Sequence, residues 1–201
     1  MAARPCGFDS LLAHQLIIYL VLILAVLIVI LIFSSKHFSP VPYFPTNKKD
    51  LKLVIKALNL RNNQTVVDLG AGDGLVIFEA AKEAAKRNLN TKFIAVELNP
   101  ILVLILHLRR LFNPNKQNIR IIYGDMFKIN LSNVILVYPE SGQARLTVYL
   151  YISPWLMDKL YKKLKVELKS FNLVSYYYPL PKVKPSRIIS GKNKIYLYGL
   201  I

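Results

Sequence analysis

The sequence predicts an α/β fold: a mostly parallel sheet with a C-terminal antiparallel hairpin, preceded by one membrane-spanning helix. Three observations predict it. From Asp50 onward, strand-like and helix-like apolar patterns alternate, which is typical of a parallel sheet covered by helices. Near the C-terminus the residues GKN separate two short apolar runs, which is a hairpin signal. Ahead of both lies a long uncharged run, LIIYLVLILAVLIVILIF, at Leu16–Phe33.

This apolar run is long enough to cross a bilayer. At about 1.5 Å per residue it extends about 27 Å, close to the hydrocarbon thickness of a membrane. A cleaved signal peptide has a shorter apolar core that ends at small residues, whereas this run ends in FSSK. A signal peptide and a buried core helix are the alternatives. We expect a transmembrane anchor in residues 1–35, with the span at about 13–33.

The residues after the run indicate a connector and an orientation. Residues 36–49 include the stretch PVPYFP, so we expect a proline-rich connector there and the folded domain at 50–201. Basic residues beside a span favour the cytoplasmic side, and only Arg4 precedes the run. The lysines that follow it are Lys36, Lys48, Lys49 and Lys52. We therefore expect a single-pass membrane protein with a cytoplasmic C-terminal domain.

The chain is strongly basic, with 27 Lys+Arg against 11 Asp+Glu and a net charge of +16. Such a balance suits an anionic partner, either a lipid surface or a nucleic acid. The basic residues are scattered and form no recognisable nucleic-acid-binding motif, so membrane lipid is the expected partner and nucleic acid is not. Cys6 is the single cysteine and the histidines are far apart, so we expect neither an intrachain disulfide nor a metal site.

The periodicity of apolar residues gives the order of elements. Helices are expected at 50–59, 73–87, 100–112 and 154–169, and strands at 65–69, 92–98, 119–123, 146–152, 171–178, 187–190 and 194–200. The run Val134–Tyr138 is apolar and β-branched, so a strand is expected there as well. The sequence leaves open whether residues 134–147 form an extra strand or an inserted loop.

The stretch VVDLGAGDG, Val66–Gly74, follows an expected strand and opens an expected helix. Open α/β sheets bind their ligands at such turns. No lysine follows Gly74, which excludes a Walker loop, and Leu75 stands where the dinucleotide fingerprint requires its third glycine. The remaining pattern is an acid, Asp68, followed by glycine at alternate positions. Glycine there lets the backbone adopt positive φ and pass close to a ligand.

With its context, this pattern resembles the first motif of class I S-adenosylmethionine (SAM) methyltransferases. The resemblance implies a Rossmann-like sheet in which Asp68 lies near the cationic methionine end of SAM. Glu97, at the end of FIAVE, is expected to accept hydrogen bonds from both ribose hydroxyls. Asp125, at the end of IIYGD, would accept from the adenine amino group. Structural roles are the alternatives: a loop-binding acid for Asp68, a helix cap for Asp73 and a turn former for Asp125.

The order of VPYFPTNKK, VELNP, IRIIYGD and YYYPLPKVKP resembles a small membrane-anchored subgroup that includes mitochondrial protein-lysine methyltransferases and bacterial relatives. The resemblance covers about residues 40–200. It implies that the Pro-Thr segment helps to close the SAM site, which makes Phe44 and Thr46 candidates. The inserted VILVYPESGQAR departs from the pattern at the substrate-facing edge. The expected cofactor-binding residues are Thr46, Asp68, Gly70, Ala71, Gly72, Gly74, Glu97, Asn99, Asp125 and Met126.

These features predict a membrane-anchored SAM-dependent methyltransferase that acts on a lysine of a membrane protein. Methyl transfer needs an aligned nucleophile and exclusion of water, and an aromatic, apolar site favours the neutral form of lysine. The candidate substrate residues, expected after the fourth core strand, are Tyr149, Tyr151, Pro154 and Trp155, with core packing or membrane contact as their alternative. A methyltransferase for a small or lipid-like molecule and a non-catalytic SAM-binding membrane scaffold are the alternative functions. No catalytic base is identified.

Overall fold

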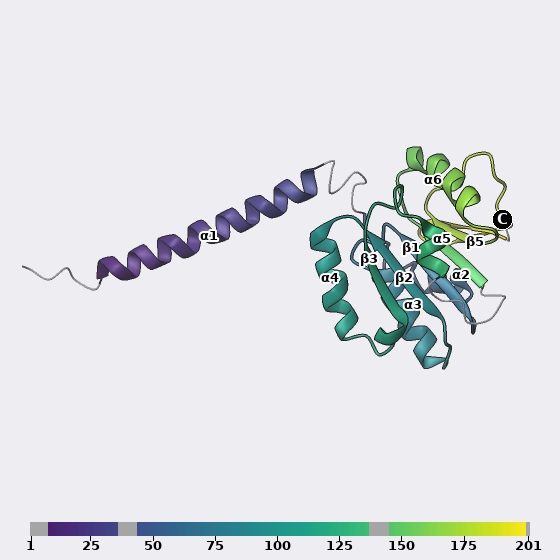
Figure 1. The fold of residues 1–201 in the computed structure, drawn as a ribbon, viewed down its shortest axis with the longest axis horizontal. Coiled ribbons are helices and arrows are strands. Elements are labelled where there is room, and N and C mark those ends of the chain that lie inside the picture. Colours follow the sequence, from purple (N-terminus) through teal and green to yellow (C-terminus); the bar gives the residue numbers. More distant parts are fainter. Residues whose placement is uncertain (1–7, 36–43, 137–144, 200–201) are drawn as a thin grey trace, which may run out of the picture. The chain divides into compact units, whose positions relative to one another are not determined.

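The structure is a computed structural model that describes residues 8–35, 44–136 and 145–199. It divides the chain into two compact units, Met1–Pro40 and Val41–Ile201. In the first unit, helix α1 runs over Phe8–Ser34 (Figure 1). Its stretch Leu12–Ser34 is long and apolar enough to cross a membrane. A signal sequence also meets this criterion of length and composition.

The second unit is built on a seven-stranded sheet with the order β3-β2-β1-β4-β5-β7-β6. The strands are β1 (Gln64–Leu69), β2 (Lys92–Glu97), β3 (Ile119–Tyr123), β4 (Arg145–Leu150), β5 (Asn172–Tyr176), β6 (Arg187–Ser190) and β7 (Lys194–Tyr198). The first five are parallel, whereas β7 is antiparallel to both β5 and β6. The mostly parallel sheet and the C-terminal antiparallel hairpin are therefore confirmed.

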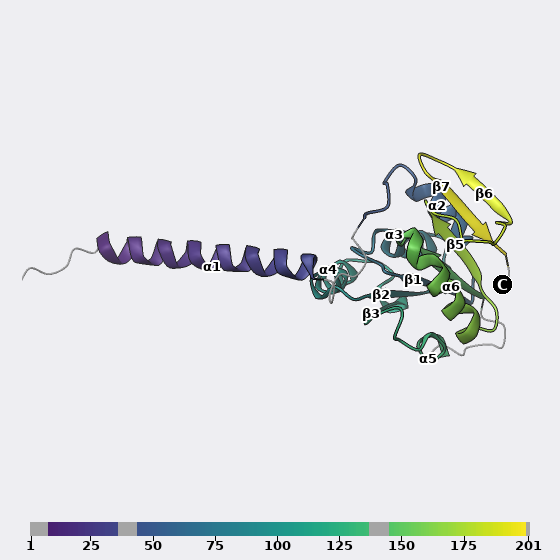
Figure 2. The same ribbon diagram turned by 90° about the horizontal axis from the view of Figure 1, so that it is seen from above.

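Helices cover both faces of this sheet, as Figure 2 shows. They are α2 (Leu51–Leu58), α3 (Leu75–Lys86), α4 (Pro100–Leu111), α5 (Leu131–Leu136) and α6 (Pro154–Glu167), with a short 3-10 helix, η1, at Lys116–Asn118. The apolar faces of α2, α3 and α4 pack with Val66 and Ala95 in one core. Those of α5 and α6 pack with Val67 and Ile94 in a second core. Successive strand residues thus point to opposite layers, which explains why the central strands are apolar throughout.

The strand expected at Val134–Tyr138 is wrong where the structure describes it. Residues Leu131–Leu136 form the helix α5, and residues 137–144 lie outside the described part of the chain. Asn130 precedes the helix, and its Oδ1 accepts the amide of Asn133 at 3.1 Å. This cap, together with burial of Leu131 in the second core, favours a helix. A short apolar run alone does not distinguish the two states.

The strand order places a ligand site at one position on the sheet. From β1 the chain moves outward through β2 to β3, and it then returns to the other side of β1 at β4. The strand order therefore changes direction between β1 and β4: the connection after β1 leads to one side of the sheet, and the connection before β4 leads to the other. Beyond the carboxyl ends of these two strands lies the crevice where open α/β sheets bind ligands. The glycine loop follows β1 at this position.

Candidate cofactor site

The glycine loop lies between β1 and α3 and is held against the end of β2. The amides of Gly70 and Ala71 both donate to the carbonyl of Val96, at 2.9 Å each. Gly70, Gly72 and Gly74 have φ values of 87°, 59° and 76°. Residues with a Cβ rarely adopt these values, so the alternate spacing of glycine reflects a backbone requirement at each of the three positions.

Gly70 and Gly74 differ in what surrounds them. A Cβ on Gly74 would lie 2.4 Å from Leu106 Cδ2 on α4 and 2.5 Å from Phe78 Cε2. The loop therefore packs against α4 too closely for a side chain. A Cβ on Gly70 would meet its nearest neighbours, including Met126 Cε, only at 3.7 Å, and Gly70 is exposed. The loop thus presents accessible backbone beside Met126.

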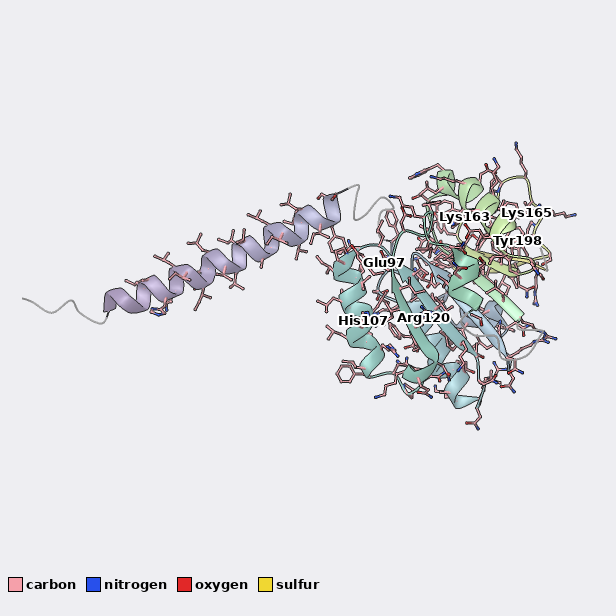
Figure 3. The ribbon with its side chains drawn as sticks, viewed as in Figure 1. Glu97, His107, Arg120, Lys163, Lys165 and Tyr198 are labelled. Atoms are coloured by element: carbon pink, nitrogen blue, oxygen red, sulfur yellow. The ribbon has the colours of Figure 1, made fainter. Side chains whose placement is uncertain are left out.

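Glu97 connects the glycine loop to the turn that follows β2. Its Oε2 accepts the amide of Gly72 at 2.7 Å, and its Oε1 accepts the amides of Leu98 and Asn99 at 2.8 Å each. A carboxylate has about four acceptor positions, so these bonds leave about one for a ribose hydroxyl. The bidentate contact predicted from the sequence requires one backbone bond to open. Figure 3 shows Glu97 beside the beginning of α4.

Asp68 is a buried acid in β1, with only 3% of its surface exposed. Burial raises its pKa well above the usual range, and the charges of Glu97 and Asp73 raise the pKa further. No hydrogen bond among the described residues involves its carboxyl group. A carboxyl group in such surroundings gains strongly from a nearby cation, because the cation favours its charged form.

Thr46 reaches this acid through Tyr149. In the register of β1 and β4, Tyr149 pairs with Asp68, and its hydroxyl lies 3.1 Å from Thr46 Oγ1. Burial, and then the charge of Asp68, raises the pKa of Tyr149, so its hydroxyl stays neutral. The expectation that Tyr149 follows the fourth core strand is wrong: it lies inside β4 and is buried. Its contacts place it between Thr46 and Asp68.

Asn99, Asp125 and Met126 lie at the turns after β2 and β3. Asn99 caps α4, because its Oδ1 accepts two amides of the first helical turn at 3.0 and 3.3 Å. Its buried Nδ2 has no hydrogen-bond partner among the residues that the structure describes. Asp125 forms a turn, with its Oδ1 accepting the amide of Phe127 at 2.8 Å. Met126 is buried beside Gly70, so an apolar side chain lies next to the open loop.

A cavity of about 800 Å³ lies on the Asp73 side of the loop. Its walls come from five parts of the domain: Pro45–Lys49, Asp73 with Leu75, Arg109, Tyr151, and Tyr176 with Asn193. Glu97, Asn99 and Met126 are not part of its lining. The candidate residues therefore form two neighbouring regions, one around Glu97 and one around the cavity, and the glycine loop joins them.

Asp73 and Arg109 form an ion pair at this cavity. Arg109 Nη1 lies 2.5 Å from Asp73 Oδ2 and donates to the Asp73 carbonyl at 2.7 Å. The other carboxyl oxygen of Asp73 accepts the amide of Leu75 at 3.2 Å at the start of α3. Asp73 is therefore occupied as a cap and an ion-pair partner. No sequence pattern pointed to Arg109, which lies on the next helix.

The four candidate substrate residues lie in different surroundings. Tyr151 follows β4, lines the cavity and packs edge-on against Tyr176, with ring centroids 4.9 Å apart. Tyr149 is buried behind it in β4. Pro154 opens α6, a position that suits proline, and Trp155 is exposed; neither lines the cavity. The structure thus brings Tyr151, but not Pro154 or Trp155, to the cavity.

Asp50 is a buried acid that no sequence pattern singled out. It accepts the hydroxyl of Tyr176 and the amide of Lys192 at 2.7 Å each, and the amide of Asn193 at 2.9 Å. Burial alone would raise its pKa, but these hydrogen bonds outweigh burial and lower the pKa. Burial and the bond to Asp50 raise the pKa of Tyr176 to about 12, although Asn193 opposes this. No local pattern could reveal contacts so distant in sequence.

The residues around the loop fit SAM. Gly70 offers open backbone, Asn99 Nδ2 is an unpaired buried donor, and Glu97 retains acceptor capacity for a ribose. The buried carboxyl group of Asp68 suits the cationic methionine end. Within the described ranges, no group of three or more His, Cys, Asp or Glu side chains could hold a metal ion. Fold and site together define a class I methyltransferase, a class whose cofactor is SAM.

Comparison with known proteins gives the family. The chain belongs to the family of ANTKMT methyltransferase domains, whose model matches residues 68–187. Among curated relatives, the ATP synthase c-subunit lysine N-methyltransferase of Xenopus laevis is 29% identical over 161 residues, which cover 79% of this chain. The match spans 63% of the Xenopus protein. A protein-lysine N-methyltransferase of Saccharolobus islandicus is 26% identical, with 79% of this chain and 92% of that protein covered.

Solved structures agree on the fold. An RNA methyltransferase from Salinibacter ruber, in complex with S-adenosyl-L-homocysteine, matches with a TM-score of 0.62 and 20% identity. The match covers 77% of this chain and 92% of that one. At this level of identity the likeness concerns the fold, and it confirms the Rossmann-like methyltransferase sheet that the glycine motif predicted.

Proposed function

We propose that this chain is a SAM-dependent protein-lysine N-methyltransferase that is held at a membrane by α1 and modifies a membrane protein. The observation that carries the proposal is the cavity beside the glycine loop. It adjoins the predicted methionine end of the cofactor through Asp73 and Thr46, and its far wall is aromatic, with Tyr151 and Tyr176. A lysine side chain that enters this cavity would approach the position where a transferable methyl group is expected.

The aromatic wall suits a lysine substrate for two reasons. The rings of Tyr151 and Tyr176, whose centroids are 4.9 Å apart, line the cavity and attract a cation during binding. The reaction needs the neutral amine, and low polarity around Tyr151 and Tyr176 disfavours the ammonium form. Burial raises the pKa of Tyr151, so its hydroxyl stays neutral and adds no negative charge that would keep the lysine protonated.

When bound, SAM supplies a methyl group on a sulfonium that is already a good leaving group. The remaining tasks belong to the chain: Asp68 would hold the methionine end of the cofactor and Glu97 its ribose, Thr46 and Tyr149 would close one side, and Tyr151 would limit water. The ammonium proton leaves before transfer, and the open cavity gives it a route to solvent. Such a site accelerates the reaction mainly by alignment and desolvation.

The rim of the cavity favours a protein substrate over a small molecule. Lys48 and Lys49 lie on the rim and are exposed, so the cavity opens to solvent beside the segment that precedes α2. A small apolar acceptor is better served by an enclosed apolar pocket. The names of the curated relatives, which specify lysine, favour the same choice. Insertion of α1 would confine the domain near acceptors in a membrane.

Transfer of labelled methyl from SAM to membrane fractions tests this proposal. The full chain, purified in detergent, is compared with Tyr151→Ala, Glu97→Gln and the surface control Glu79→Gln. We expect label in methyllysine of a membrane protein with the wild type and the control, and at least about tenfold less with the other two variants. Label in lipid or in a small molecule, or equal transfer by the Glu97 variant, would contradict the proposal.

A further inference from the structure

The outward face of α4 is apolar in a way that the other surface helices of the domain are not. Leu104, Leu108 and Leu111 are 60%, 51% and 62% exposed, and Phe112, directly after the helix, is 87% exposed. These four residues, here called the α4 face, recur at helical spacing along one side. His107, which also lies exposed on α4 between Leu104 and Leu108 in sequence, is polar (Figure 3). A surface helix of a soluble domain normally carries polar residues at such positions.

The other long helices of the domain supply an internal comparison. The exposed positions of α2 are Lys52 and Lys56. On α6 the exposed apolar residues Trp155 and Val166 lie at opposite ends of the helix, and between them are the exposed lysines Lys159, Lys162 and Lys165. Among the described residues of the second unit, nothing covers the α4 face, because its leucines stay more than half exposed. Contiguous exposed apolar side chains of this kind mark an interaction surface.

Charge around the α4 face identifies the partner. The stretch from Pro100 to Arg120 contains no acidic residue, and Arg110 and Lys116 lie at and just after the end of α4. Arg109 is paired with Asp73 on the inner side and does not count toward this charge. Leucine and phenylalanine flanked by arginine and lysine form the combination that binds the boundary between lipid headgroups and acyl chains, with a preference for anionic lipid. The net charge of +16 adds to this preference.

The cavity lies close to this face. Arg109 lines the cavity from the inner side of α4, while Leu108 on the same turn is exposed on the outer side. Pro45, near the point where the chain enters the domain, lines the same cavity. Residues 36–43 reach about 30 Å at most when fully extended, so an inserted α1 would keep the domain at the membrane surface.

We infer that the α4 face docks the domain onto an anionic lipid bilayer. Docking is a second membrane contact, separate from α1, and it would place the cavity next to the bilayer surface where lysines of membrane proteins lie. The contact itself does not depend on methyl transfer, so it can be tested without SAM or an acceptor.

Fluorescent labels on single cysteines report the contact. In the full chain with Cys6→Ser, an environment-sensitive dye is attached at Leu108→Cys, or at Val166→Cys as the control. Val166 is 86% exposed on α6, which covers the opposite face of the sheet. The proteins are reconstituted in vesicles of phosphatidylcholine, with or without about a third phosphatidylserine, that contain lipid carrying a spin-label quencher.

We expect blue-shifted emission from the dye at position 108 and quenching at least about twofold stronger than at position 166, and more so with phosphatidylserine. Leu104→Ser in the Leu108→Cys background should weaken the quenching. Water-like, equally unquenched emission from both positions would overturn the inference. A blue shift that appears without lipid and grows with protein concentration would also overturn it, because a second copy of the chain would then cover the α4 face.

Discussion

At the residue scale, the sequence predicts which residues form the site, but it does not predict the raised pKa of Asp68. The spacing of the glycines points to a ligand-binding loop, and the resemblance to class I methyltransferases adds the acids Asp68 and Glu97. The pKa of Asp68 is raised first by its burial in β1, where it pairs with Tyr149 of β4. The charges of Glu97 and Asp73, which the fold brings nearby, raise the pKa further. The sequence alone does not predict this pKa shift, because the shift arises from contacts between separate strands and loops.

Replacement of Asp68 by asparagine should stabilise the ligand-free protein and weaken SAM binding. The folded pKa of Asp68 lies above the unfolded pKa, so the native state loses stability as the pH rises through the folded pKa. The asparagine variant escapes this loss. Its thermal midpoint, measured by circular dichroism, should exceed that of the wild type by a margin that grows with pH. An equal or lower midpoint at neutral pH would contradict the account.

The same substitution removes the carboxyl group that is proposed to face the cationic end of SAM. An interaction with a charged group contributes about 1.5–3 kcal/mol, so affinity should fall by about tenfold or more. Calorimetric titration of both proteins with SAM measures the difference. Unchanged affinity would mean that Asp68 serves only the structure of the loop.

Gly74→Ala should be strongly destabilising, because a Cβ there has both a positive φ and three contacts shorter than 3 Å, one with Leu106 and two with Phe78. Overpacking costs about 1–3 kcal/mol, and the left-handed conformation adds about 1–2 kcal/mol. Gly199→Ala is the control, since a Cβ at that position meets nothing within 4 Å. Chemical denaturation should separate the two variants by at least about 2 kcal/mol. Similar stabilities would contradict this prediction, because they would mean that α4 can move away from the added Cβ without a loss in the free energy of unfolding.

At the element scale, most helices and strands were predictable, but the apolar run at 134–136 was not. The helix at Leu75–Lys86 and the strand at Ile119–Tyr123 agree with the patterns that predicted them. The run at 134–136 became part of α5 because the cap at Asn130 and burial of Leu131 decided between two states that the pattern allows. Asp50, which joins the start of α2 to the β6–β7 turn, had no local signal at all.

Asp50→Ala should loosen the β6–β7 hairpin from α2. It leaves the hydroxyl of Tyr176 and the amides of Lys192 and Asn193 without their acceptor, which should cost about 3 kcal/mol in the free energy of unfolding. Hydrogen exchange should rise at β7 more than at β2. Unchanged exchange at β7 would contradict this role.

The pH dependence of this variant has a defined sign. The folded pKa of Asp50 lies below its unfolded value, so its contribution is present above the unfolded pKa and is lost as the pH falls through the folded pKa. The difference in stability between wild type and Asp50→Ala should therefore be full at neutral pH and shrink under acid conditions. A difference that grows toward low pH would contradict the assignment.

At the scale of the whole molecule, the sequence predicts two parts, an apolar helix and a Rossmann-like domain, and both are present. It predicts the parallel sheet with its antiparallel end because connection lengths and turn residues constrain those features. The sequence does not predict the cavity, whose lining residues range from Pro45 to Asn193. It also does not predict that leucines of α4 are exposed. Periodicity indicates that a helix is apolar, but only the packed structure shows which side remains uncovered.

The central claim is that the glycine loop and Glu97 bind SAM. The most direct measurement is calorimetric titration of SAM into the full chain in detergent, beside Glu97→Gln and the control Glu79→Gln, whose carboxylate pairs with Lys82 on the surface. We predict saturable one-to-one binding by the wild type and the control, and at least about tenfold weaker binding by Glu97→Gln. Absence of binding by the folded wild-type chain, or equal binding by all three proteins, would contradict the claim.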